Sequence, residues 1–156
     1  MKAAVLDAFH APLAVQEIPE PCRQRPDDVV VRVAGAGVCH TDVHLWTGEW
    51  SDVAHRTLQL PHILGHENVG WIEELSSSES GTDLMVGDPV LLFPMRACGA
   101  CEPCRAGREM LCLTGKEPGI HSVPGGYAEL LVTGERCLVP APPLEDLAAI
   151  APLADA

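Results

Sequence analysis

The chain of 156 residues is short for a multidomain enzyme, and with 47% hydrophobic and 21% charged residues it holds enough apolar material for a folded core. Acidic residues outnumber Lys and Arg by 22 to 10, and the net charge of −12 disfavours anionic partners such as nucleic acid and the membrane surface. No apolar run approaches the ~18 residues that would span a bilayer.

The first part of the chain has the pattern of short β-strands separated by Pro and Gly. Strands are predicted at residues 2–6, 13–18 and 28–33. The third has the sequence Asp-Val-Val-Val-Arg-Val, in which the odd-numbered valines share one face. This alternation predicts a strand that is buried mainly on one side.

Two glycines and a short helix follow this strand. The segment 35–40 begins like a dinucleotide-binding fingerprint, but its sixth position is histidine, so we interpret the glycines as the exit of the strand. Residues 41–47 are predicted to form one or two helical turns, capped by Thr41 or Asp42 and ended by Gly48.

The remaining predicted strands are short and irregularly spaced, which is typical of a barrel or a sandwich. A polar turn at 76–81 and a cysteine-rich excursion at 97–112 interrupt them. From Pro143 the sequence favours a helical region that stops without a cap, and this predicts a chain cut inside a longer protein. The strands are predicted at 68–75, 89–93, 127–132 and 137–139.

Seven cysteines are many for a chain of this length, and an odd number cannot all pair within one chain. The N-terminal segment lacks a signal-peptide pattern, because Asp7 interrupts it before an apolar region forms. We therefore expect a cytoplasmic protein, in which clustered thiols bind metal more often than they form disulfides.

Four of the cysteines form one ordered group, separated by two, two and seven residues. Two-residue gaps let consecutive sulfurs turn toward one point, and four thiolates complete the tetrahedral shell of a structural zinc ion. A redox pair or an iron–sulfur cluster is the alternative for this group. Its members are Cys98, Cys101, Cys104 and Cys112.

A second group is dispersed in the sequence. Cys39 follows the best predicted strand and His66 stands in Leu-Gly-His-Glu, and with one further ligand they would form an open zinc site. Composition alone favours a buried thiol and an ordinary histidine instead. Cys22 and Cys137 are interpreted as inert thiols.

Further motifs occur in a fixed order along the chain. They are Gly37-Val38-Cys39-His40-Thr41-Asp42, Leu64-Gly65-His66-Glu67, Gly87-Asp88, the four-cysteine group, Gly125-Gly126-Tyr127-Ala128-Glu129 and Ala151-Pro152-Leu153-Ala154-Asp155. With these motifs the whole chain, 1–156, resembles the N-terminal GroES-like catalytic domain of zinc-dependent medium-chain alcohol dehydrogenases. The resemblance implies a mainly β fold: a partly open barrel with short helices and a zinc-binding lobe at about 94–115. It also implies that the Rossmann cofactor domain is absent from this chain.

The resemblance further implies the ligands of a catalytic zinc ion. Cys39 and His66 match the first two, and Asp155 matches the third, which is cysteine in many members and aspartate in some. Glu67 matches a carboxylate behind the zinc, and Asp42 matches one that holds the other nitrogen of the histidine ligand. Without the resemblance, Asp155 is an exposed terminal aspartate and the other two carboxylates are turn or cap residues.

The remaining site residues concern substrate, cofactor and proton. The resemblance implies that Thr41 bonds the alcohol oxygen, that His44 ends a proton relay and that His40 contacts the cofactor pyrophosphate. It places Trp50 and Phe93 in the alcohol pocket. The alternatives are a solvated helix histidine for His44 and core aromatic residues for Trp50 and Phe93.

The function implied is oxidation of an alcohol to an aldehyde or ketone, with two zinc ions per chain and hydride transfer to NAD or NADP through the absent domain. We expect a small-molecule substrate, no nucleic-acid or membrane partner, a homo-oligomeric full-length protein, and an isolated chain without activity. The alternative is a stand-alone GroES-like module that binds zinc or a partner and has no enzymatic activity.

Overall fold

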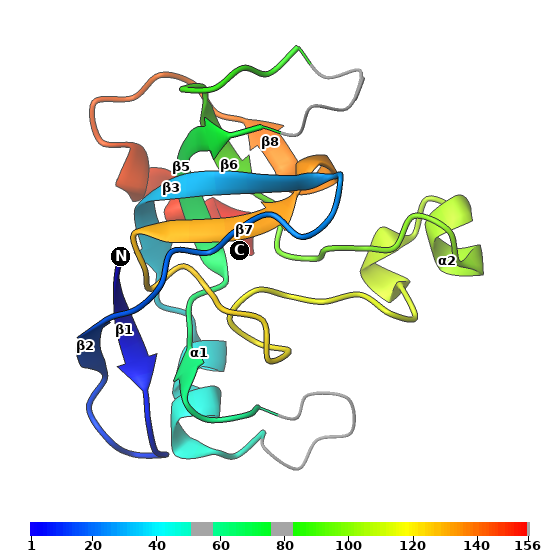
Figure 1. The fold of residues 1–156 in the computed structure, drawn as a ribbon. Helices are drawn as coiled ribbons and strands as arrows, with labels where there is room; N and C mark the ends of the chain where they lie inside the picture. Colours follow the sequence, from blue (N-terminus) through cyan, green and yellow to red (C-terminus); the bar gives the residue numbers. More distant parts are fainter. Residues whose placement is uncertain (51–57, 76–82, 156) are drawn as a thin grey trace.

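The computed structural model describes residues 1–50, 58–75 and 83–155. Its strands form two open sheets in which every neighbouring pair is antiparallel (Figure 1). The predicted mainly β, open architecture is therefore confirmed. The predicted turn at 76–81 lies outside the described residues.

The smaller sheet has the order β2-β1-β4 and the larger one the order β7-β3-β5-β6-β8. The strands of the smaller sheet are β1 (Lys2–Leu6), β2 (Ala14–Glu17) and β4 (His62–Ile63). Those of the larger sheet are β3 (Asp28–Gly37), β5 (Glu67–Glu74), β6 (Pro89–Leu92), β7 (Leu130–Gly134) and β8 (Leu138–Pro140). The helices are α1 (His40–Thr47), α2 (Glu102–Arg105) and the 3-10 helices η1 (Glu109–Leu111), η2 (Glu135–Cys137) and η3 (Leu147–Ala154).

Strand β3 departs from its prediction in burial. Val29 and Val31 lie in the main apolar core, as expected, but Asp28 and Val30 on the opposite face are buried as well. The Asp28 carboxylate accepts hydrogen bonds from the backbone N–H groups of Gln24 and Arg25, at 2.7 and 2.8 Å. The segment before the strand thus covers the face that the alternation assigned to solvent.

Strand β3 is also longer than predicted. It does not end at Val33 but continues through the glycines, pairing with β5 beyond a register shift between Val33 and Gly35. A Cβ on Gly35 would lie 2.6 Å from the Cβ of Ala148, so the missing side chain lets η3 approach the strand. Helix η3 packs there through Leu147 and Ala151.

Helix α1 ends at Gly48 as predicted, but it begins one residue earlier and is capped by Cys39. The prediction of Thr41 or Asp42 as the cap was wrong. Asp42 stands at the third helical position, and its carboxylate reaches back to accept the N–H of Cys39 at 3.0 Å. This contact fixes the start of the helix beside the cysteine.

Strand β7 begins three residues later than its predicted start at 127. The residues before it pair elsewhere, because the N–H groups of Gly125, Gly126 and Tyr127 donate to the carbonyls of residues 63, 65 and 64. The same contacts hold the two-residue strand β4, which was too short to predict. These hydrogen bonds hold the loop before β7 against β4 and the turn that precedes β5.

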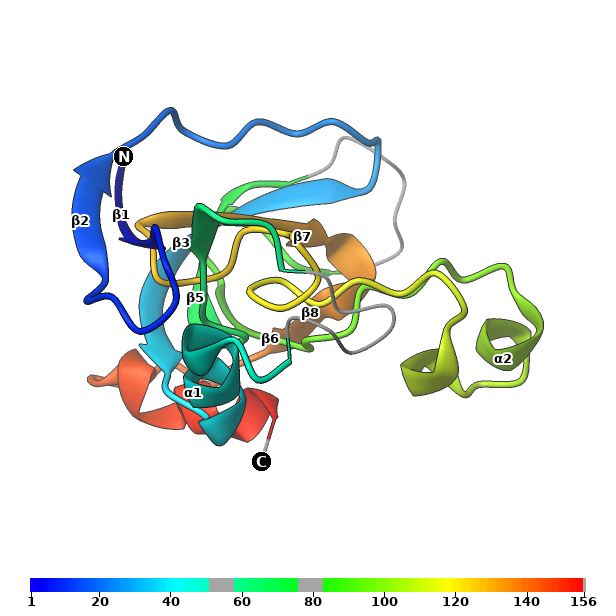
Figure 2. The ribbon, with the colours of Figure 1, turned by 90° about the horizontal axis from the view of Figure 1, so that it is seen from below.

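The cysteine-rich segment, with α2 and η1, projects from the body in two perpendicular views (Figures 1 and 2). Figure 2 shows α1, η3 and the C-terminus together on one side of the larger sheet. None of the helices in the described part of the chain combines the length and apolar character needed to cross a membrane.

Candidate metal centres

The four cysteines of the projecting lobe, Cys98, Cys101, Cys104 and Cys112, converge on one point. The Sγ–Sγ distance is 4.0 Å between Cys98 and Cys104, 3.3 Å between Cys101 and Cys104, and 3.9 Å between Cys101 and Cys112. Zinc–sulfur bonds of ~2.3 Å in a tetrahedron place sulfurs about 3.8 Å apart. The lobe therefore has the size of a closed four-thiolate zinc site.

The backbone of the lobe favours thiolates. The N–H groups of Ala100 and Cys101 donate to Cys98 Sγ at 3.4 and 3.3 Å, and they lower the pKa of Cys98 to about 6. Burial raises the pKa of Cys104, and the neighbouring sulfurs raise it further. A divalent cation would relieve this repulsion among the sulfurs.

A second convergence brings together Cys39, His66, Glu67 and Asp155, whose ligand atoms all lie within 4.8 Å of one another. Asp155 Oδ2 lies 3.7 Å from Cys39 Sγ and 3.6 Å from His66 Nε2. His66 is buried, whereas the Asp155 side chain is 41% exposed. The group combines sulfur, nitrogen and oxygen donors and has one side open to solvent.

Three elements bring these residues together. Cys39 lies just beyond β3, His66 just before β5, and the pair Gly37–Glu67 joins the ends of those strands. Asp155 follows η3, which packs against the same strands. The site is therefore assembled by the larger sheet.

The bend that presents His66 is made by Gly65, whose φ is +96°. This left-handed conformation suits glycine, and a Cβ there would lie 2.6 Å from Cδ1 of Tyr127. The Gly65 N–H donates to Asp42 Oδ1 at 3.1 Å. This hydrogen bond connects helix α1 to the turn that precedes β5, beside the candidate ligand His66.

Asp42 lies beside the imidazole of His66, with 3.5 Å between Oδ1 and Nδ1. Burial lowers the pKa of His66, but the carboxylate of Asp42 and the thiol of Cys39 outweigh it and raise the pKa to about 9. Burial raises the pKa of Glu67; the charge of His66 lowers it and that of Asp155 raises it. The cluster carries more acidic groups than one imidazolium balances, so it favours a cation.

Tyr127, in the motif Gly-Gly-Tyr-Ala-Glu, is a neighbour of the site for which the sequence analysis predicted no role. Its hydroxyl donates to the carbonyl of Gly37 at 3.1 Å. Burial raises the pKa of Tyr127, and the carboxylates of Asp42 and Glu67 raise it further. The phenol therefore stays protonated and holds the end of β3 in place.

The residues assigned to the proton relay lie on α1. The ring of His44 stacks between those of His40 and Trp50, with centroid distances of 5.1 Å on both sides. His44 Nδ1 lies 2.6 Å from Oε2 of Glu49, a partner that sequence reasoning missed. Thr41 is half-buried on the same helix.

The two aromatic residues assigned to the substrate pocket differ. Trp50 packs against the apolar cluster around Leu6 and Leu45, so it serves the core as well as the ring stack. Phe93 is half-buried after β6, and its N–H donates to the carbonyl of Cys137 at 2.8 Å. Among the described residues, no hydrogen bond, ion pair or ring contact joins Phe93 to the Cys39 cluster.

The remaining two cysteines stand apart from both clusters. Cys22 is exposed, whereas Cys137 is buried, and burial raises the pKa of Cys137. A raised pKa disfavours the reactive thiolate, which agrees with the prediction of an inert thiol at Cys137. None of the seven cysteines forms a disulfide.

Comparison with known proteins decides the family. Residues 25–143 match the alcohol dehydrogenase GroES-like domain. The chain belongs to this family. The GroES-like domain is 44% identical over 130 residues to an alcohol dehydrogenase of Geobacillus stearothermophilus, covering 83% of this chain and 36% of the relative. It is 38% identical to D-arabinose 1-dehydrogenase (NADP(+)) of Saccharolobus solfataricus, covering 99% of this chain and 42% of that one.

The fold of this chain is also similar to that of a solved alcohol dehydrogenase structure. The crystal structure of the alcohol dehydrogenase of Aeropyrum pernix superposes on this GroES-like domain with a TM-score of 0.90 and 43% identity, over 99% of this chain and 44% of that one. The domain thus spans about two fifths of the length of these relatives.

Proposed function

We propose that this GroES-like domain is the catalytic, zinc-binding part of an NAD(P)-dependent dehydrogenase that interconverts a small alcohol and its aldehyde or ketone. The observation that carries the proposal is the contrast between the two clusters. The lobe offers four like donors that close a shell, whereas Cys39, His66, Glu67 and Asp155 form a mixed set of sulfur, nitrogen and oxygen donors that reaches solvent at Asp155, which is 41% exposed. A catalytic zinc ion needs such a set.

The residues present fit zinc at the second cluster. Both ring nitrogens of His66 are buried without a hydrogen-bond partner among the described residues, which is costly unless a cation or proton engages them. When bound, zinc would supply Lewis acidity that polarises an alcohol or carbonyl oxygen. We propose that Cys39, His66 and Asp155 would bind the zinc ion and that Asp42 orients the imidazole of His66.

Proton transfer falls to α1 in this proposal. Thr41 stands two residues after Cys39, where its hydroxyl can accept and pass on the alcohol proton. His44, whose side chain is 34% exposed, can release that proton to solvent, and Glu49 and the flanking rings of His40 and Trp50 keep its imidazole in place. His40 is exposed at the helix start and is proposed to meet the cofactor pyrophosphate.

The finer assignments belong to the same proposal. We propose two zinc ions per chain, a nicotinamide cofactor bound through a further domain, a cytoplasmic location and a homo-oligomeric full-length protein. Seven thiols without a disulfide support a reducing compartment. The named relatives act on different substrates, an unspecified alcohol and D-arabinose, so the substrate class stays at small alcohols.

The test is alcohol-dependent reduction of NAD or NADP by the protein encoded by the complete reading frame that contains this domain. The Cys39→Ser variant is expected to lose activity by at least a hundredfold, because a catalytic zinc ligand is missing. Cys22→Ser is the matched control, since Cys22 is exposed and belongs to neither cluster. Equal activity of the two variants, or full turnover by the isolated 156-residue chain, would contradict the proposal.

A further inference from the structure

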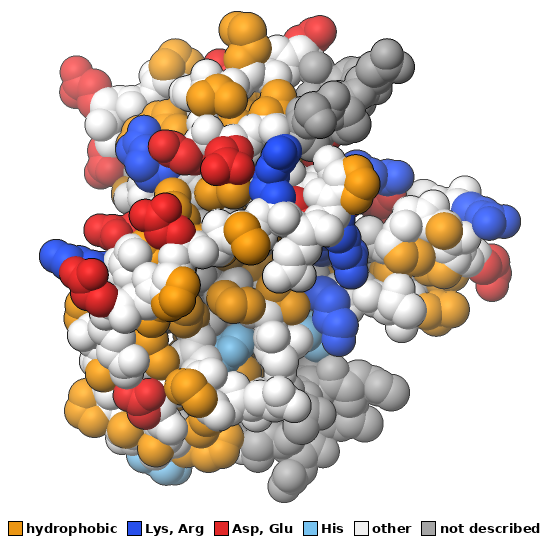
Figure 3. Space-filling view, in the orientation of Figure 1, with side chains coloured by type: hydrophobic (Ala, Val, Ile, Leu, Met, Phe, Trp, Pro, Cys, Tyr) orange, Lys and Arg blue, Asp and Glu red, His pale blue; other side chains and the backbone are white. Residues whose placement is uncertain are grey.

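Asn68 is a buried polar residue that belongs to neither metal cluster. Charged side chains are spread over the surface seen in Figure 3, whereas His66, Glu67 and Asn68 form a run of buried polar residues around the start of β5. Two of these three belong to the second metal cluster, but Asn68, which is 2% exposed, does not. Because burying an amide costs free energy unless hydrogen bonds replace those it makes with water, its contacts should explain its presence.

The contacts of Asn68 lead to one peptide group. Its Nδ2 donates a hydrogen bond to the carbonyl oxygen of Gly65 at 3.1 Å, and the N–H of Gly126 donates to the same oxygen at 2.8 Å. A carbonyl oxygen has two lone pairs, and these two donors occupy both. The N–H of Gly65 is held as well, since it donates to Asp42. Both backbone polar groups of Gly65 are therefore fixed.

This carbonyl belongs to the peptide bond that joins Gly65 to His66. Gly65 has a φ of +96° and no side chain to restrict its backbone, so hydrogen bonds rather than steric contacts decide how that peptide plane lies. The orientation of the plane in turn sets the direction in which the backbone presents the imidazole of His66. Without the Nδ2 donor of Asn68, the peptide plane would have a wider range of orientations.

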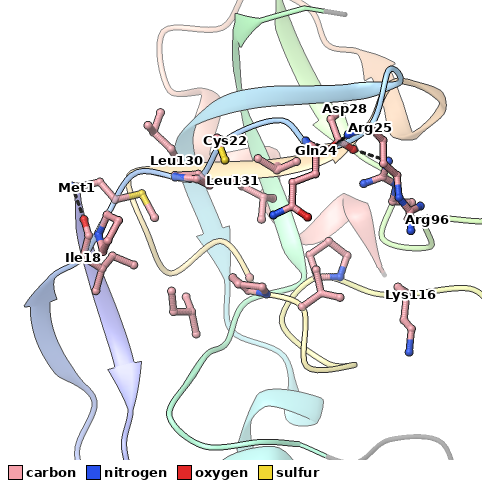
Figure 4. A pocket seen from close by; sticks show the side chains of 18 of the residues that line it. Met1, Ile18, Cys22, Gln24, Arg25, Asp28, Arg96, Lys116, Leu130 and Leu131 are labelled. Atoms are coloured by element: carbon pink, nitrogen blue, oxygen red, sulfur yellow. Dashed lines mark hydrogen bonds and ion pairs between the residues drawn. The ribbon is translucent and has the colours of Figure 1, made fainter.

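The other half of the Asn68 amide narrows the choice of roles. Its Oδ1 is buried without a hydrogen-bond partner among the described residues, and turning the amide over would place that oxygen against the Gly65 carbonyl, where two acceptors repel. Gly125 lines the cavity drawn in Figure 4 but Asn68 does not, so the oxygen serves no ligand there. A leucine would fill a similar volume without an unpaired oxygen. The contact of Nδ2 with Gly65 is what asparagine provides and leucine cannot.

We infer that Asn68 is a positioning residue of the second metal cluster, whose amide fixes the Gly65 carbonyl and thereby orients His66 toward the metal ion. The inference rests on the metal site of the proposed function and adds to it a residue outside the set of ligands. Gly126 belongs to the same arrangement, because a Cβ there would overlap Oδ1 and Cγ of Asn68. Alanine at position 126 should therefore displace the amide, and it should fit once the amide has been removed.

The first test is NMR of the His66 imidazole in the 156-residue chain without metal. Asn68→Ala, Asn68→Leu and Gly126→Ala should each shift the imidazole signals of His66. Asn68→Leu is the decisive variant, because it keeps the volume of the side chain and removes only the donor. If Asn68→Leu leaves the His66 signals as they are in the wild type, Asn68 only fills space and the inference is overturned.

The second test is cadmium NMR of the same variants. Cadmium bound by four thiolates and cadmium bound by a mixed set of donors give separate signals, so the lobe serves as an internal reference. The variants should shift the signal of the second cluster and leave that of the lobe unchanged. Zinc affinity at the second cluster should fall about tenfold, as is typical when a group that supports a metal ligand is lost.

The effects of the two alanine variants should not add. Gly126→Ala has nothing left to displace in Asn68→Ala, so the double variant should match Asn68→Ala alone. Thr133→Val is the control, since Thr133 is a buried polar residue of β7 outside both clusters, and it should move none of these signals. Additive effects, or an equal shift in Thr133→Val, would overturn the inference. A wild type without cadmium at the second cluster would refute the proposed function, while the imidazole signals still decide whether Asn68 positions His66.

Discussion

The two metal clusters are built in opposite ways. The lobe draws four thiols from residues 98–112, a span short enough to close as a loop on the surface. The second cluster draws Cys39 and Asp155 from positions 116 residues apart, and it exists only because the larger sheet and η3 hold them together. A local set can be closed and structural, whereas a set spread over the fold can leave one side open for chemistry.

The largest loss of stability is expected from a change in the four-cysteine lobe. Cys104→Ser removes its buried thiol, and because loss of the metal removes what holds the lobe, we expect destabilisation of roughly 4 kcal/mol or more. Hydrogen exchange should become fast across 97–116 while β3 and β5 stay protected. Cys22→Ser serves as the control, and an unchanged lobe in the Cys104 variant would refute a structural metal there.

The second cluster should respond to a change made at a distance from every candidate ligand. Gly35→Val places a side chain against Ala148, and overpacking of this kind costs about 1–3 kcal/mol. Displacement of η3 should carry Asp155 away, so zinc should bind more weakly at Cys39 and His66 and unchanged in the lobe. Zinc titration monitored by calorimetry checks this, with Asp155→Asn as the comparison that removes the ligand without moving the helix. An equal loss of zinc affinity at both clusters would contradict the view that only the second cluster depends on the packing of η3.

The pH dependence of the stability of the metal-free protein reports on the charge of His66. Its pKa of about 9 exceeds the ordinary value of 6.5, so the charged imidazole stabilises the fold fully below pH 6.5, and this stabilisation of roughly 3 kcal/mol is lost as the pH rises through about 9. Asp42→Asn should lower the pKa and flatten the decline. Urea unfolding of EDTA-treated protein between pH 6 and pH 10, read together with the imidazole NMR signal, measures both. If the free energy of unfolding fell more steeply with pH in Asp42→Asn than in the wild type, the carboxylate of Asp42 would not be what raises the pKa of His66.

The smallest effect concerns Glu49. Its contact with His44 is exposed, and exposed pairs contribute about 1 kcal/mol or less. Glu49→Gln in the full-length protein should therefore reduce kcat by no more than about fivefold, whereas His44→Gln should reduce it further and change the pH profile. Identical pH profiles for His44→Gln and the wild type would remove His44 from the proton relay.

The sequence predicted what is local. The spacing of four cysteines indicated the lobe, and alternating valines and bounding prolines located most strands to within a few residues. It did not predict that Asp28 would be buried, because the segment that covers it lies outside the strand. Nor could it place Cys39 as the cap of α1, since thiols are uncommon caps and the carboxylate of Asp42 acts from inside the helix.

The candidate site could be predicted only through the resemblance. From residues alone, Cys39 and His66 favoured an ordinary thiol and histidine, and nothing local linked them to Asp155. The fold supplies that link, by pairing β3 with β5 and by packing η3 at Gly35. Glu49 and Tyr127 were missed because their contacts depend on a helix end and on a loop fastened to β4.

The most direct test of two different centres is the zinc content of the purified chain and of two single variants, measured by elemental analysis. Two zinc ions are expected in the wild type, one in Cys39→Ser with the lobe still protected, and one in Cys104→Ser with the lobe exposed. One zinc ion in the wild type, unchanged by Cys39→Ser, would contradict a metal site at Cys39, His66 and Asp155.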